Sequence, residues 1–66
     1  MRPLLTPREK EVCALLCVGK TNKEVAHELG ISHRTVEDHR INILKKYRAR
    51  NMIEVVLFVH NIVEPA

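Results

Sequence analysis

One segment, residues 21–41, constrains the fold of this chain most, because its small, turning and apolar residues occupy the tight points of two helices joined by a three-residue corner. Ala26 is small where the two helices must approach each other closely, and Gly30 can adopt the positive φ that ends a helix. Ser32 is a favourable N-cap for the next helix, and Val36 would point into the angle between the helices. This spacing predicts a helix-turn-helix, the arrangement that places its second helix in a groove of DNA.

Capping residues predict four helices, and no strand pattern competes with them. The first two helices open with capping boxes, in which Thr6 and Thr21 each precede a Glu by three positions. Ser32 caps the third helix, and Asn51 with the Met-Ile-Glu that follows it resembles a third box. The sequence therefore predicts a single all-α domain over residues 1–66, a four-helix helix-turn-helix domain with helices at about 7–18, 22–29, 33–48 and 52–63.

The length and composition of the chain exclude several classes of protein. A chain of 66 residues builds one small core and has no room for an enzyme cleft with its own supporting shell. No apolar run approaches the roughly 20 residues of a membrane span, and the first residues lack the apolar stretch of a secretory signal. We therefore expect a cytoplasmic, globular protein with no enzymatic activity and no membrane partner.

The cysteines and histidines do not form a recognisable cofactor site. Cys13 and Cys17 lie four apart on one predicted helix, too close along a rigid face for a favourable bridge, and no second Cys pair completes a zinc site. We interpret both as reduced packing residues, with a Cys-x-x-x-Cys metal or redox site as the alternative. His27, His33 and His60 are scattered over three helices with no acid spaced to join them. The sequence predicts no metal and no cofactor.

The third predicted helix has one apolar side and one polar side. Its inner side carries Val36, Arg40, Ile43, Leu44 and Tyr47. Basic residues are concentrated around this helix, since residues 19–50 carry eight Lys or Arg against four acids, whereas residues 51–66 carry two acids and no Lys or Arg. This distribution favours contact with phosphates over a merely solvated surface, which is the alternative. The side expected to meet DNA carries Arg34, Glu37, Asp38, Ile41, Lys45 and Arg48.

Three motifs carry a resemblance to a known family: LTPREKEV at residues 5–12, GKTNKEVA at 19–26 and LGISHRTVEDHR at 29–40. In these motifs the chain resembles the LuxR/FixJ family of bacterial DNA-binding domains, also called GerE-like, and it is most similar to FixJ-type response-regulator effector domains. The resemblance implies a domain that binds double-stranded DNA through its third helix, dimerises through its fourth and regulates transcription. RNA polymerase is a further candidate partner.

The resemblance also implies which residues contact DNA. The base-contacting positions of the family fall on Glu37, Asp38 and Ile41, and Ile41 could contact a thymine methyl group. Acids are unexpected there, because phosphates repel a carboxylate unless it accepts a hydrogen bond from a cytosine amino group. The alternative is that Glu37 pairs with Arg34 or Arg40, and Asp38 with Arg34, and so organises arginine for phosphate. The family's backbone contacts fall near Asn22, Lys23, Arg34, Thr35 and Lys45.

The last predicted helix is apolar almost all round, and a core this small cannot cover every side of it. Part of the helix should therefore meet another chain, and we expect a symmetric homodimer that presents two recognition helices to successive major grooves. The alternatives are burial of the helix by its own domain, or a protein-interaction module that heterodimerises with a larger regulator. The expected dimer interface comprises Ile53, Val56, Leu57 and His60.

Overall fold

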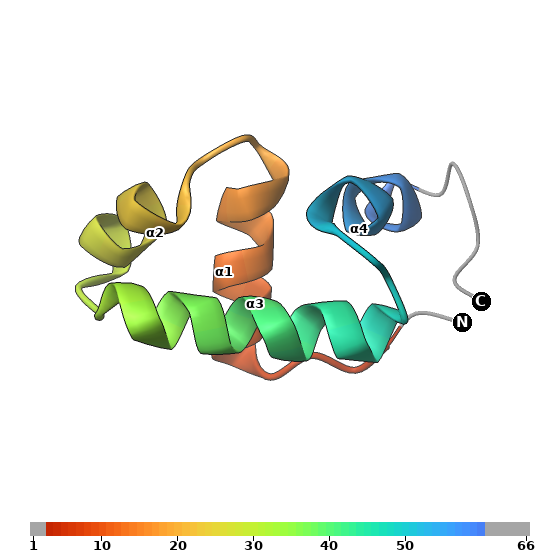
Figure 1. Ribbon diagram of the computed structural model, residues 1–66, viewed down its shortest axis with the longest axis horizontal. Helices are drawn as coiled ribbons and strands as arrows, with labels where there is room; N and C mark the ends of the chain where they lie inside the picture. The colour runs from red at the N-terminus through yellow and green to blue at the C-terminus, as the bar shows by residue number, and fades with distance from the viewer. Residues whose placement is uncertain (1–2, 61–66) are drawn as a thin grey trace.

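The computed structural model describes residues 3–60, and this range contains four helices (Figure 1). In Figure 1, α3 runs along the lower edge, α1 crosses behind it, and α2 and α4 lie on opposite sides of α1. The described part of the chain contains no strand, so the predicted all-α class is confirmed. The helices are α1 (Pro7–Cys17), α2 (Asn22–Leu29), α3 (His33–Tyr47) and α4 (Met52–Val59).

The first two helices begin with the predicted capping boxes. Thr6 Oγ1 accepts a hydrogen bond from the backbone N–H of Glu9 at 3.2 Å, and Glu9 Oε1 accepts one from the backbone N–H of Thr6 at 2.9 Å. The same reciprocal pair joins Thr21 and Glu24, at 3.1 and 2.9 Å. Each box satisfies two N–H groups that have no acceptor within the helix, so residues four apart or less fix where α1 and α2 begin.

The last two helices begin with a single cap. Ser32 Oγ accepts from the backbone N–H of Thr35 at 3.0 Å, and Asn51 Oδ1 accepts from that of Glu54 at 3.0 Å. Glu54 does not return to the N-cap residue, because its Oε1 accepts from the backbone N–H of Arg50 at 2.8 Å. The predicted N-cap, Asn51, is therefore confirmed. The reciprocal hydrogen bond to Glu54 comes from Arg50, one residue before the N-cap.

Gly30 ends α2 as predicted. It adopts φ 67° and ψ 35°, a left-handed conformation that glycine reaches without steric cost. The N–H of Ile31 then donates to the carbonyl of Ala26 at 3.0 Å, which satisfies one of the carbonyl groups left open at the end of the helix. This turn leads the chain directly to Ser32, the N-cap of α3.

Two helices end one residue before the predicted boundary, because the chain enters the left-handed region earlier. α1 ends at Cys17 and the chain reaches φ 95° at Gly19. α3 ends just before Arg48, which adopts φ 55° and ψ 39° although it is not glycine. The predicted last helix extends beyond α4, and its residues 61–63 lie outside the described part of the chain.

The core is aliphatic and draws on every helix. The buried aromatic residue Tyr47 stacks on Phe58 of α4, with ring centroids 6.1 Å apart and an interplanar angle of 16°. Because α3 contributes to the core along most of its length, its buried side fixes which side is left for a partner. The largest fully buried side chains are Val12 of α1, Val25 of α2, Val36 and Ile43 of α3, and Val55 of α4.

An ion pair between the buried Glu9 and the exposed Lys46 joins the start of α1 to the end of α3. Glu9 is 4% exposed, and its Oε1 lies 2.6 Å from Nζ of Lys46. Hydrogen bonds from the Lys46 ammonium and from the N–H of Thr6 hold the pKa of Glu9 below its ordinary value. Lys46 is one of the basic residues between positions 19 and 50, but in the structure it is engaged by Glu9 and not free for DNA.

Both cysteines are free thiols that pack in or against the core. Cys13 is buried and Cys17 is half-buried, in agreement with the predicted packing role. Burial raises the pKa of Cys13 to about 12, since an apolar environment disfavours the thiolate. Desolvation likewise raises the pKa of Cys17.

Candidate nucleic-acid interface

The helix-turn-helix is built at the points that the sequence predicted. Ala26 and Val36 lie where α2 meets α3, and they are 7% and 0% exposed. The corner between the helices consists of Gly30 and the two residues that follow it. Because these buried contacts hold one side of α3 against α2, the opposite side of α3 faces away from the domain.

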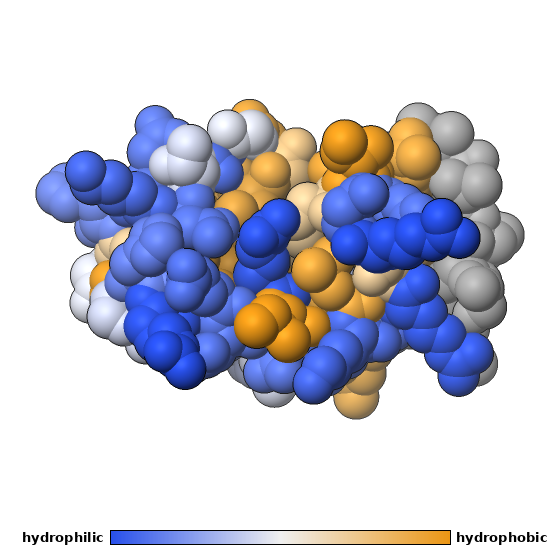
Figure 2. All heavy atoms as spheres, viewed as in Figure 1, coloured by the Kyte–Doolittle hydropathy of each residue, from blue (hydrophilic) through white to orange (hydrophobic). Residues whose placement is uncertain are grey.

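The polar side of α3 is exposed as the helical wheel predicted. Its most apolar residue, Ile41, is 50% exposed. Figure 2 shows mainly hydrophilic residues over α3, interrupted by apolar atoms near the middle of the helix. The residues Arg34, Asp38, Lys45 and Arg48 are also exposed, whereas Glu37 is half-buried.

Both acids on the exposed side of α3 have a basic partner one helical turn earlier. The predicted pair of Asp38 and Arg34 is present, with Oδ1 and Nε 3.4 Å apart. The prediction for Glu37 was wrong, because this acid does not pair with Arg34 or Arg40 but lies 3.5 Å from Nδ1 of His33. That contact is an ion pair only when the imidazole is protonated, so Glu37 is held less firmly than Asp38. His33, Arg34 and Asp38 are exposed and Glu37 is half-buried, and such surface pairs stabilise a helix only slightly.

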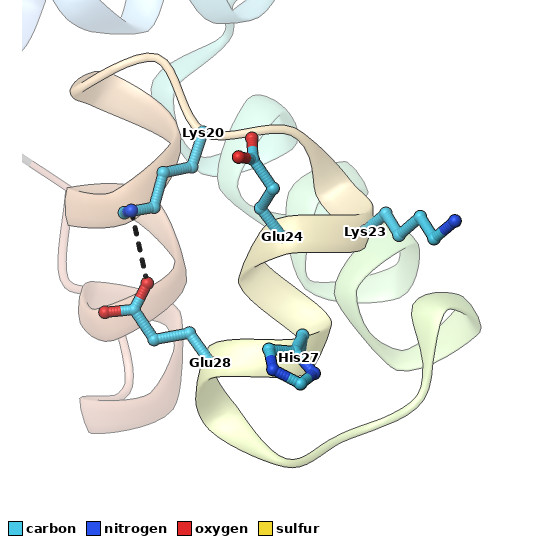
Figure 3. Close-up of a pocket in the computed structure, with 5 residues that line it drawn as sticks. All are labelled: Lys20, Lys23, Glu24, His27 and Glu28. Atoms are coloured by element: carbon cyan, nitrogen blue, oxygen red, sulfur yellow. Dashed lines mark ion pairs between the residues drawn. The ribbon is translucent and has the colours of Figure 1, made fainter.

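The start of α2 offers a second set of polar groups beside α3. Asn22 is half-buried and Lys23 is exposed at the first two positions of α2. Figure 3 shows Lys23 pointing away from α1, whereas Lys20 turns back and its Nζ lies 3.5 Å from Oε2 of Glu28. These residues, with Glu24 and His27, line an open depression of about 560 Å³. Lys23 makes no ion pair within residues 3–60, so its charge is available to a partner.

The first turn of α3 is pre-ordered by side-chain hydrogen bonds. Thr35 is half-buried, and its hydroxyl lies 2.7 Å from that of Ser32. The N-cap bond from Ser32 fixes the same turn, as described above. A hydroxyl held in this position can donate to a phosphate near the positive end of the α3 dipole.

The basic residues from Arg40 to Arg50 divide into groups with different surroundings. Arg40 is half-buried on the inner side of α3, and Lys46 is engaged by Glu9. Lys45 is exposed and makes no ion pair with any described residue. The sequence placed Lys45, and not Lys46, on the side of α3 expected to meet DNA, but no local pattern indicates that a glutamate 37 positions earlier would bind Lys46.

α4 exposes part of its apolar surface. Ile53 is 72% exposed and His60 is exposed, while Val56 and Leu57 are half-buried. On the other side of the helix, Val55 is fully buried. Among the residues of α4 only Ile53 is exposed, and the helix packs against both α1 and α3, so its own domain covers much of its apolar surface.

Residues 3–60 contain neither a metal-binding cluster nor a membrane-spanning helix. No three His, Cys, Asp or Glu side chains in this range lie together as a metal ion would require. None of the four helices described there is long and apolar enough to cross a membrane.

Comparison with known proteins identifies the family to which the chain is related. Residues 3–59 match the family described as bacterial regulatory proteins, luxR family. The chain is 50% identical over 52 residues to the uncharacterized response regulatory protein YgeK of Escherichia coli (strain K12), and this match covers 79% of the chain and 35% of YgeK. It is 45% identical over 56 residues to the spore germination protein GerE of Bacillus subtilis (strain 168), covering 85% of the chain and 76% of GerE.

A third relative is the transcriptional regulatory protein FixJ of Rhizobium meliloti (strain 1021), 40% identical over 52 residues, which are 79% of the chain and 26% of FixJ. The chain thus spans about a third of YgeK and a quarter of FixJ, so its likeness to these two proteins concerns one part of each. The matched residues include all four helices described above. The chain belongs to the luxR family of bacterial regulatory proteins, a family of regulators and not of enzymes.

Proposed function

We propose that this chain binds double-stranded DNA sequence-specifically and regulates bacterial transcription, with α3 in the major groove. The observation that carries the proposal is the exposed side of α3, which lies opposite the buried residues Val36 and Ile43 and beside the closely packed corner with α2. An α-helix fits the width of the major groove of B-DNA. The name of FixJ, a transcriptional regulatory protein, suits this activity, and we propose that the chain acts in the cytoplasm.

Ile41 is the proposed centre of base contact. Its exposed side chain lies among the polar residues of α3 and offers an apolar surface to a thymine methyl group. Glu37 lies one turn earlier on the same side, and its weakly held carboxylate can accept a hydrogen bond from a cytosine amino group. Asp38 has a different proposed role, because its bond to Arg34 orients the guanidinium toward a phosphate.

The proposed backbone contacts surround this centre. Lys45 would contact phosphate beyond the base-reading half of α3, and Arg34 and Thr35 would do so at its first turn. Asn22 and Lys23 lie at the N-terminus of α2, where free N–H groups and the helix dipole attract an anion. Because these contacts carry no sequence information, they would set affinity and register while α3 sets specificity.

We propose that the active form is a homodimer with α4 at its two-fold axis. Ile53, Val56, Leu57 and His60 form the side of α4 that the domain leaves exposed or half-exposed. Covering apolar surface against a second copy is favourable, and a two-fold dimer would present its α3 helices to two half-sites of a palindromic sequence. RNA polymerase is a proposed partner of the DNA-bound dimer.

Selection from a pool of random duplexes tests the proposal. Bound sequences are amplified, and the affinity of the chain for the selected site is measured by fluorescence anisotropy at several salt concentrations. A two-fold symmetric site and a steep fall in affinity with salt are expected, because Lys and Arg displace the counterions of several phosphates. The proposal would be contradicted if the chain binds no duplex at low salt although circular dichroism shows that it is folded. It would leave the alternative, in which α4 heterodimerises with a larger regulator.

A further inference from the structure

Two thiols lie side by side on α1, away from the side of α3 proposed for DNA. Cys13 and Cys17 stand on successive turns of the helix, and their Sγ atoms are 3.9 Å apart. Neither forms a disulfide, and the core packs around both. The DNA-binding proposal assigns no role to either residue. The two thiols are nevertheless adjacent and are potential metal ligands.

The chemistry of sulfur decides which ions could use the pair. Thiolates are soft ligands and prefer soft metal ions, whereas structural zinc demands four ligands. No third His, Cys, Asp or Glu joins the two thiols within the described residues. The pair therefore suits an ion that is satisfied by two thiolates.

The distance between the sulfur atoms is close to what such an ion needs. With metal–sulfur bonds of about 2.3 Å, a linear complex places the two sulfur atoms about 4.6 Å apart. The observed distance of 3.9 Å between the two sulfur atoms must then increase by several tenths of an ångström. Cys17 lies near the end of α1 and is half-buried, so its side chain has the room that Cys13 lacks.

We propose that Cys13 and Cys17 form a two-coordinate site for a soft, thiophilic metal ion. Each thiol gives its proton to solvent and each sulfur forms one bond to the ion, so one ion replaces two protons. A divalent ion such as Hg(II) yields a neutral complex, which suits the apolar surroundings. A monovalent ion such as Cu(I) leaves one negative charge near the C-terminus of α1, where the helix dipole disfavours an anion. Binding of Hg(II) is therefore tighter than binding of Cu(I).

Proton release makes the site dependent on pH. Each thiol must lose its proton to bind the ion, so the affinity for the ion increases as the pH is raised. The ion also joins two successive turns of α1, and it binds the folded arrangement in which the two sulfur atoms are adjacent. It should therefore raise the midpoint temperature of unfolding, by an amount that grows with the logarithm of its free concentration once this exceeds the dissociation constant.

The test is a titration of the reduced full chain with Hg(II) in excess monothiol, followed by ultraviolet absorption, native mass spectrometry and circular dichroism. A single protein thiol cannot displace the excess monothiol from Hg(II). Two adjacent thiols can, because the second binds at a high effective concentration. We expect one ion per chain with two protons lost, unchanged helicity and a higher unfolding temperature. Cys17→Ser and Cys13→Ala should each weaken binding more than tenfold, Zn(II) should not bind, and Cu(I) should bind more weakly than Hg(II).

Several outcomes would overturn the proposal. They are two ions per chain, one ion shared by two chains, or binding that Cys17→Ser leaves intact. Loss of helicity on binding would also do so, because the thiols would then not be preorganised. No binding by the folded chain is equally decisive. Cys17→Ser changes a half-buried residue and should remain folded, so the result does not depend on the core variant.

Discussion

At the residue scale, the neighbours Lys45 and Lys46 illustrate how position on a helix divides two identical side chains between function and stability. Lys45 is exposed on the side of α3 proposed for DNA, whereas Lys46 points to the buried Glu9. Glu9 serves two structural purposes, since it also completes the capping box of α1. A carboxylate this deeply buried depends on its partners, because leaving it unpaired would incur its full desolvation penalty.

Replacing either lysine by methionine should separate the two roles in stability. Lys46→Met leaves Glu9 without its cation and should lower the free energy of unfolding by about 1–3 kcal/mol. Lys45→Met removes an exposed charge and should change it by less than about 0.5 kcal/mol. Urea denaturation followed by circular dichroism measures both values. Equal stabilities of the two variants would show that the Glu9–Lys46 pair does not stabilise the fold.

The lowered pKa of Glu9 predicts acid sensitivity. Because its pKa is lower in the folded than in the unfolded chain, the stability it contributes is present above the ordinary value of 4.5 and is lost as pH falls through the folded pKa. Glu9→Gln should therefore be less stable than the native chain at neutral pH, with a difference that shrinks toward about pH 2. Urea unfolding across this range tests the prediction, and a difference independent of pH would contradict it.

Specificity and affinity for DNA should also separate at the residue scale. Ile41→Ala removes the proposed contact with a thymine methyl group and should relax preference at one base pair of each half-site, with little change in salt dependence. Lys45→Ala should weaken binding to all sequences and lower the slope of log affinity against log salt by about one unit. Anisotropy with the selected site and its single-base variants distinguishes them. Identical behaviour of the two variants would contradict the assigned roles.

At the element scale, the end of α3 carries a residue that is unfavourable for its backbone. Arg48 adopts φ 55°, where a side chain other than glycine costs about 1 kcal/mol. The N–H of the next residue, Ala49, donates to the carbonyl of Leu44 at 2.9 Å, so the turn is the same type that Gly30 makes after α2. Hydrogen bonds hold a conformation here that the residue itself disfavours.

This conformation predicts an ordering of two variants at position 48. Arg48→Gly and Arg48→Ala both remove the charge, but only glycine adopts the left-handed conformation without steric cost. The glycine variant should therefore be more stable than the alanine variant by about 1 kcal/mol. Thermal unfolding of the two proteins checks the ordering. Equal stability, or a more stable alanine variant, would mean that the turn does not persist in solution.

At the scale of the whole molecule, the exposed side of α4 should decide assembly. Ile53→Asp places two carboxylates near the proposed two-fold axis and should raise the dimer dissociation constant at least tenfold, or about 1.4 kcal/mol. Leu4→Asp is the matched control, because Leu4 is 87% exposed and lies outside α4. Sedimentation equilibrium measures the constant, and Ile53→Asp should also weaken binding to the palindrome more than to a half-site. A native chain that remains monomeric at every concentration would contradict the dimer proposal.

Features that depend on neighbouring residues could be predicted from the sequence alone. Thr6, Thr21 and Ser32 marked the beginnings of helices and Gly30 marked an end, because each makes hydrogen bonds to residues within about four positions. The exposed and buried sides of α3 were equally predictable, since the helical period of 3.6 residues sorts side chains before any tertiary contact forms. The family resemblance then supplied expected roles for the exposed residues, which periodicity could not.

Contacts between residues far apart in the sequence could not be predicted and required the folded chain. The same holds where a residue had several possible local partners or conformations. Glu9 and Lys46 are 37 positions apart, and no short pattern links them. Glu37 had His33, Arg34 and Arg40 within one helical turn, and in the structure it lies next to His33. The left-handed Arg48 is imposed by the turn from α3 to α4, against its own preference. Local rules failed at these residues because long-range packing and hydrogen bonding outweighed intrinsic preference.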